Sequence, residues 1–180
     1  MFHSRRLQRQ RGVSLLEVMI SLVIVGIGVL GLIGMQARAM SNQRDSFDRK
    51  AAAELMAQIS ERMRANHLGF MANNYASTLL PADAVGTATA CVLASPCTAA
   101  QQASSDLVSW HTQIRNRLPS SGAVIGTSGA AGSVIGSGAN SMRITMIWRE
   151  ASPTGGTDAA CAAVGVNDGS FRCLVGEVFP

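Results

Sequence analysis

The sequence predicts an α+β fold in which a long amino-terminal helix packs on a small antiparallel β-sheet. Three patterns support this prediction: an apolar run without charge from Val18 to Met35, an amphipathic stretch from Gln36 to about Asn66, and the alternation of Met142, Ile144, Met146 and Trp148 with Arg143, Thr145 and Arg149. A chain of 180 residues can form one modest domain and a long additional element.

The net charge of +4 comes from the first twelve residues. Four of the 15 basic residues lie there without an acid: Arg5, Arg6, Arg9 and Arg11. The other basic residues balance the 11 acidic residues of the chain. Only 4% of the residues are aromatic, so surfaces for base stacking are scarce. We therefore expect no nucleic-acid partner.

The amino terminus predicts a membrane segment. A basic leader ends at Gly12, and the apolar run that follows is long enough to cross most of a bilayer as a helix. The arginines place the leader in the cytoplasm. We expect a cytoplasmic leader peptide at 1–12, a transmembrane and assembly helix at 13–36, and a periplasmic head at 37–180 that includes the amphipathic half of the helix.

Glu17 is unusual because a carboxylate at the start of a membrane segment needs a compensating partner. A cleaved secretory signal with the small-residue site Ala37-Arg38-Ala39 would have a shorter apolar run and no such acid. An uncleaved anchor leaves Glu17 unexplained, and the run without charge argues against a surface amphipathic helix.

The residues around this acid resemble a known family. The segment Gly12-Val13-Ser14-Leu15-Leu16-Glu17 is similar to the type III signal of type IV prepilins, although the family usually has phenylalanine where Val13 stands. The stretch from Gly26 to Met40 resembles the PilV-like branch of minor pilins. The resemblance implies a pilin fold, cleavage by a prepilin peptidase between Gly12 and Val13, and N-methylation of Val13.

The resemblance also implies roles in assembly. Glu17 would pair with the Val13 amine of a neighbouring subunit. Four glycines would let the helix extend locally or, equally, pack closely against another helix: Gly26, Gly28, Gly31 and Gly34. The chain would sit in the bacterial inner membrane and then in the pilus at the cell surface. Its partners would be membrane lipid, prepilin peptidase, the inner-membrane assembly platform, other minor and major pilins, and a pilus tip adhesin.

The function implied is a structural minor pilin that takes part in initiating or capping a type IV pilus, with roles in twitching motility and adhesion. One alternative is a minor pseudopilin of a type II secretion system, which has the same signal. Another is a membrane-anchored binding module for adhesion or DNA uptake.

The rest of the sequence predicts the head. Along the amphipathic stretch, apolar residues recur at helical spacing: Met40, Phe47, Ala51, Leu55, Ile59 and Met63. The sheet should bury the stripe from Phe47 to Met63, and the helix should end between Asn66 and Gly69. Tyr75 to Gln102 indicates an irregular connection. A second helix should begin at an N-cap of Ser104 or Ser105 and stop at Pro119.

Residues 120–141 are rich in glycine and serine and predict a loop or hairpin, with a third candidate strand that starts near Ala123. Strands are expected at 142–149 and 174–179. The four cysteines indicate disulfides in an oxidising compartment: Cys91, Cys97, Cys161 and Cys173. Local pairing is preferred, although four cysteines allow three arrangements.

No pattern predicts an enzyme, a cofactor or a metal site. His3, His67 and His111 are scattered and are expected at the surface or at helix ends. Asp45 with Asp48, and Glu54 with Glu61, fit the solvated face of a helix. No nucleophile or metalloprotease motif is present.

Overall fold

The computed structural model describes residues 12, 14–87, 96–127, 141–150 and 155–179. The chain divides into two compact units, residues 1–40 and 41–180.

One helix, α1 (Leu15–Ala65), connects the two units in sequence. Glu17 lies in its first turn, and Arg62 and Arg64 lie in its last, which places charges of the favourable sign at both ends of the helix dipole. The predicted uninterrupted helix is therefore confirmed. It stops at Asn66, which opens the short helix α2 (His67–Met71), and the side chain of Asn66 accepts a hydrogen bond from Gly69 N at 3.2 Å.

Within residues 41–180, α1 buries Ala52, Leu55, Ile59 and Met63 at helical spacing. The predicted stripe was wrong at its start, because the side chain of Phe47 is 70% exposed. Periodicity gives the spacing of a buried face, but it does not tell where the rest of the head begins to cover the helix.

Asp45 and Asp48 are half-buried and precede Ala52 at the same spacing, so their assignment to the solvated face was also wrong. Burial raises the pKa of Asp48, and the negative charge of Asp45 raises it further. The head-facing side of α1 thus begins with two acids and continues with apolar residues.

The sheet has four antiparallel strands in the order β1 (Ser77–Leu79), β2 (Gly122–Thr127), β3 (Met142–Arg149) and β4 (Phe171–Val178). β3 is confirmed as predicted, β2 starts close to the expected residue, and β4 begins three residues earlier than expected. β1 lies in a segment that was expected to be irregular, so that expectation was wrong. The segment 128–140 lies outside the described residues.

The second long helix, α3 (Ala99–Arg117), begins earlier than predicted. Its N-cap is Thr98, which forms a capping box with Gln101, so the assignment of Ser104 or Ser105 was wrong. The Thr-x-x-Gln signature was present in the sequence, but the two alanines within it, Ala99 and Ala100, carry no periodic signal. The helix ends before Pro119, as expected.

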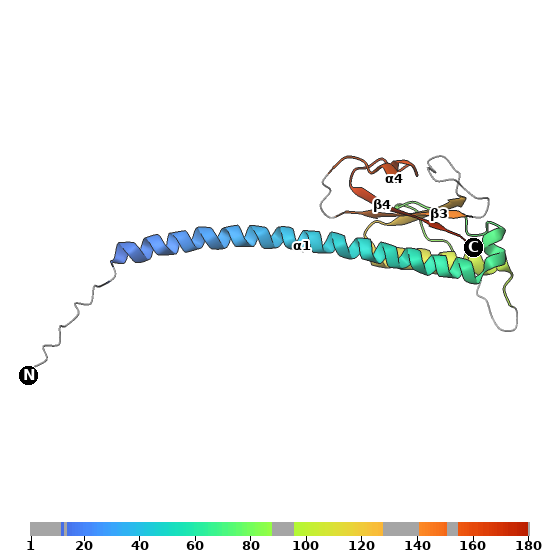
Figure 1. The fold of residues 1–180 in the computed structure, drawn as a ribbon, viewed down its shortest axis with the longest axis horizontal. Helices are drawn as coiled ribbons and strands as arrows, with labels where there is room; N and C mark the ends of the chain where they lie inside the picture. The colour runs from blue at the N-terminus through green and yellow to red at the C-terminus, as the bar shows by residue number, and fades with distance from the viewer. Residues whose placement is uncertain (1–11, 13, 88–95, 128–140, 151–154, 180) are drawn as a thin grey trace, which may run out of the picture. The chain divides into compact units, whose positions relative to one another are not determined.

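Within residues 41–180 the sheet lies between the helices α1 and α3 on one face and the short helix α4 (Ala159–Ala162) on the other (Figure 1). This confirms the predicted α+β class. The larger core contains side chains from α1, α3 and the inner face of the sheet, among them Leu55, Ile59, Trp110, Ile114, Ile144, Met146 and Val178.

A smaller core on the other face joins Cys161 of α4 to Ile147 and Phe171. Cys161 and Cys173 form a disulfide with 5.3 Å between their Cα atoms, one of the local pairings that the sequence favours. Cys97 is also disulfide-bonded, and Cys91 lies outside the described residues. Both covalent links belong to the head.

Candidate functional site

The predicted processing site lies just before α1. Gly12 is exposed and belongs to no helix or strand, while Val13 and the rest of the leader, residues 1–11, lie outside the described residues. The helix starts at Leu15, and the carbonyl oxygen of Ser14 accepts hydrogen bonds from the N–H groups of Glu17 at 3.0 Å and Val18 at 3.3 Å. Gly12 therefore stands outside the hydrogen-bonded helix, with its backbone exposed.

Glu17 lies on the surface of the first helical turn. Its side chain borders a shallow hollow whose other lining residues come from the same side of the helix: Val18, Ser21, Leu22 and Val25. Ser21 Oγ donates to the main-chain oxygen of Glu17 at 2.7 Å, so this hydroxyl is satisfied within the helix. Among the ion pairs formed by described residues, none involves the Glu17 carboxylate.

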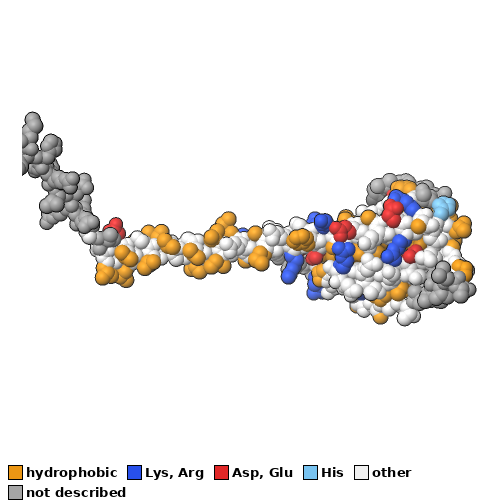
Figure 2. Space-filling view, turned by 90° about the horizontal axis from the view of Figure 1, so that it is seen from below, with side chains coloured by type: hydrophobic (Ala, Val, Ile, Leu, Met, Phe, Trp, Pro, Cys, Tyr) orange, Lys and Arg blue, Asp and Glu red, His pale blue; other side chains and the backbone are white. Residues whose placement is uncertain are grey.

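The first half of α1 has an apolar surface. Every large hydrophobic side chain from Leu15 to Met35 is exposed, and the window of highest mean hydropathy, 2.6, has none of its residues buried. In Figure 2 hydrophobic side chains cover this part of the helix, and acidic atoms appear at its start. Within the described residues, α1 is the one helix long and apolar enough to cross a membrane.

The four predicted glycines lie inside α1 without interrupting it: Gly26, Gly28, Gly31 and Gly34. A Cβ atom added at any of them would have no neighbouring atom within 4 Å, apart from the helix backbone itself. The described part of the chain therefore contains no contact that requires glycine at these positions. Any requirement would come from another molecule or from a change in the helix.

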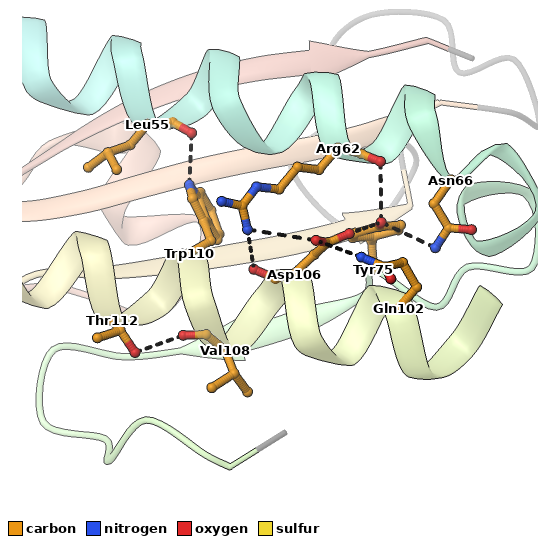
Figure 3. Close-up of polar contacts among 9 residues, drawn as sticks. All are labelled: Leu55, Arg62, Asn66, Tyr75, Gln102, Asp106, Val108, Trp110 and Thr112. Atoms are coloured by element: carbon orange, nitrogen blue, oxygen red, sulfur yellow. Dashed lines mark hydrogen bonds and ion pairs between the residues drawn. The ribbon is translucent and has the colours of Figure 1, made fainter. Parts of the chain in front are cut away.

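A half-buried polar cluster around the buried Tyr75 joins the end of α1 to α3 (Figure 3). The Tyr75 hydroxyl lies 2.7 Å from Asp106 Oδ2, and Arg62 Nη1 lies 3.7 Å from Asp106 Oδ1. Asn66 Nδ2 donates to the Tyr75 hydroxyl at 3.3 Å and to the Ala99 carbonyl oxygen at 2.8 Å. Burial, and then the contact with Asp106, raise the pKa of Tyr75, so the phenol stays protonated and the cluster is structural.

A second charged cluster was missed by sequence reasoning. Glu150 is buried after β3 and lies between Arg49 of α1, at 3.5 Å, and Arg172 of β4, at 2.7 Å. The contact with Arg172 is an ion pair without hydrogen-bond geometry, because Glu150 Oε2 has no directed donor. These residues are far apart in sequence, so no local pattern could have paired them.

His111 is not at the surface or at a helix end, which corrects the expectation. Its side chain is buried within α3, and Ser77 Oγ lies 3.3 Å from its Nε2. Burial, and then the positive charge of Arg115, lower the pKa of His111 to about 4. The ring is therefore neutral near pH 7. No group of three His, Cys, Asp or Glu side chains suited to a metal ion is found among the described residues.

Two family models match consecutive parts of the chain. The prokaryotic N-terminal methylation motif matches residues 7–33, which contain Gly12, Glu17 and three of the four glycines. The type IV pilin Tt1218 model matches residues 34–108, which contain the rest of α1, α2, β1 and the first part of α3. No curated protein and no solved structure matches the chain. Neither matching model distinguishes the PilV-like branch.

Proposed function

We propose that this chain, a member of the type IV pilin family, is a minor pilin that takes part in initiating or capping a type IV pilus. The observation that carries the proposal is an exposed apolar helix with an acid in its first turn for which the described residues supply no cation. A helix of this kind gains its stabilising contacts from lipid and from other helices.

The first step in this function is processing. A prepilin peptidase would cut after Gly12 and methylate the new amino terminus at Val13, which the match to the methylation motif supports. The exposed, non-helical Gly12 is consistent with access by a peptidase. Cleavage removes the basic leader and leaves a positive amine four residues before Glu17.

The second step is docking between subunits. In lipid the Glu17 carboxylate would pair with the Val13 amine of a neighbouring subunit, because attraction between opposite charges is strong where the dielectric constant is low. Desolvation of both groups offsets much of that attraction. The pair would therefore set the register of the two helices more than the overall affinity. The side chain of Glu17 is exposed, so a second helix can approach it.

The location follows from the same features. The apolar helix would hold the precursor in the inner membrane, with the head and its disulfides in the oxidising periplasm, until the assembly platform moves the subunit into a fibre. The partners would be other minor and major pilins and a tip adhesin. We infer no nucleic-acid role, because the chain without its leader is neutral.

The proposal is tested first by mass spectrometry of the membrane-extracted protein. We expect a mature amino terminus at methylated Val13. A start at Met40, after the small-residue site, would contradict the proposal and indicate simple secretion. The copy number in purified fibres tests the minor role, since a chain that forms most of the fibre mass would not be a minor pilin.

Glu17→Ala tests docking. We expect the variant to be cleaved and inserted but to enter fibres about tenfold less than the natural chain, because the Val13 amine of the neighbour loses its counter-charge. Glu61→Ala is the matched control, since Glu61 is an exposed acid of α1 within the head. Unchanged incorporation of Glu17→Ala would contradict the docking role. Loss of twitching without loss of protein secretion in a deletion strain separates a pilus from a type II secretion system.

A further inference from the structure

The sheet of the head has two edges, and they are protected to different extents. The β1 edge is three residues long, and the N–H of the next residue, Leu80, donates to Asp83 Oδ2 at 2.7 Å. The other edge, β4, has eight residues and pairs only with β3 among the described strands. An edge strand of that length offers a row of backbone donors and acceptors to another chain.

Alternate residues of β4 direct their backbone groups away from β3. The N–H of Glu150 donates to the Ser170 carbonyl oxygen at 2.9 Å, so Ser170 faces the β3 side, and every second residue after it does the same. Phe171, Cys173, Val175 and Glu177 therefore direct their N–H and C=O groups outward. These four residues form the free edge of the sheet.

One half of this edge is closed within the chain. The N–H of Phe171 donates to the Asp168 carbonyl oxygen at 3.1 Å, and the N–H of Cys173 donates to Asp158 Oδ2 at 3.3 Å. The Cys161–Cys173 disulfide holds α4 beside the same half. Three separate contacts thus block strand addition at this end.

The other half has no such cover within the described residues. Neither Val175 nor Glu177 has a hydrogen bond from its outward N–H to a described residue, and the Glu177 carboxylate is directed to Arg143 across the strand at 3.4 Å. Val175 and Phe179 are the exposed large hydrophobic residues of this region, at 40% and 56%. An open backbone edge and exposed apolar side chains therefore occur together.

We propose that the edge from Val175 to Phe179 receives an extended strand from a different subunit of the fibre. Only an extended backbone matches outward N–H and C=O groups that repeat at every second residue. The donor strand would carry apolar side chains opposite Val175 and Phe179. The choice of a different subunit rests on the proposed function, because a minor pilin meets other pilins far more often than a second copy of itself.

The test compares backbone amide hydrogen exchange in the full mature chain in detergent micelles and in assembled fibres that contain it in isotope-labelled form. We expect exchange at Val175 and Glu177 to slow by about tenfold or more on assembly. Leu174 and Gly176, whose amides face β3, are the internal controls and should be protected in both states. Unchanged exchange at Val175 and Glu177 on assembly would overturn the proposal. Slow exchange of these two amides already in micelles, where the chain associates with copies of itself, would also overturn it.

Val175→Pro provides a second test. Proline removes an N–H that is directed outward, so no bond to β3 is lost, whereas Val175→Thr keeps the N–H and serves as the control. We expect Val175→Pro to keep its head folded but to enter fibres about tenfold less, with Val175→Thr unaffected; if the proline variant does not fold, the exchange measurement decides. If folded Val175→Pro enters fibres normally while Glu17→Ala does not, only the strand proposal is contradicted. If both Val175→Pro and Glu17→Ala enter fibres normally, the docking role of Glu17 is contradicted as well.

Discussion

The indole Nε1 of Trp110 donates a hydrogen bond to the main-chain oxygen of Leu55 at 2.7 Å, which ties α3 to α1 inside the core (Figure 3). Both side chains are fully buried. We expect Trp110→Phe to lower the free energy of unfolding by about 2–4 kcal/mol, from a lost hydrogen bond and a new cavity. Denaturant unfolding of the full chain in detergent measures this change.

Trp148→Phe is the matched control for that change. Trp148 of β3 is buried in the same core, at 3% exposure, but its indole makes no hydrogen bond to a described residue. The two substitutions remove the same atoms, so Trp110→Phe should cost about 1 kcal/mol more. An equal cost would mean that the contact with Leu55 contributes nothing.

Gly122 lies where β2 passes close to the end of β1. A Cβ atom at this position would lie 2.2 Å from the main-chain oxygen of Leu79, and a backbone oxygen cannot move aside as a flexible side chain can. We expect Gly122→Ala to lower the free energy of unfolding by about 1–3 kcal/mol. Gly126→Ala, in the same strand but without a neighbour within 4 Å, should be nearly neutral.

The buried His111 predicts a dependence of stability on pH. Its pKa is lowered from 6.5 to about 4 in the folded chain, so between these values the unfolded chain binds a proton that the folded chain does not. Stability should therefore fall by about 3 kcal/mol as the pH drops from 6.5 to 4, and this contribution should then level off. Unfolding measured at a series of pH values tests it.

Separate replacement of His111 and His67 tests whether His111 causes this pH dependence of stability. His111→Gln should remove this part of the pH dependence, whatever its effect on stability near pH 7. His67→Gln is the control, because His67 is exposed in α2. Parallel pH curves for the natural chain and His111→Gln would show that another group is responsible.

Much of this fold could be predicted because its elements carry strong local patterns. The alternation of Met142, Ile144 and Met146 located β3, and the apolar run and its periodic continuation located α1. The polar contacts that join the elements could not be predicted. Glu150 meets Arg49 from a distant part of the chain, and its position depends on the completed sheet. Likewise, nothing in the spacing of His111 distinguishes a buried ring from a surface one.

The candidate site was predictable for the opposite reason. Gly12 and Glu17 lie in one short continuous segment, so their order in the sequence already contains the pattern that the methylation motif matches. Asp45 and Asp48 show the limit of this reasoning, because acids usually indicate solvent. The half-buried positions of these two residues depend on how far the head extends along α1, which is a property of the tertiary structure.

The Cys161–Cys173 disulfide should stabilise one part of the head. Replacing both cysteines with serine should cost about 2–3 kcal/mol, because the bond closes a loop of 12 residues. The larger core does not contain either cysteine, so hydrogen exchange should become faster near α4 and Phe171 before it does in α3. Uniformly faster exchange across the head would contradict this local role.

The glycines of α1 allow packing to be distinguished from flexibility. Gly31→Ala adds one methyl group with no neighbour within 4 Å and should stabilise the helix by about 1 kcal/mol. A close helix contact tolerates alanine, which is also small, but a helix that must extend locally does not benefit from a stronger helix former. We expect Gly31→Ala to leave insertion into the membrane unchanged and to reduce entry into fibres, as quantified by immunoblotting of sheared pili. Normal entry of Gly31→Ala together with failure of Gly31→Leu would instead assign Gly31 to packing, because only the larger side chain would then keep a neighbouring helix away.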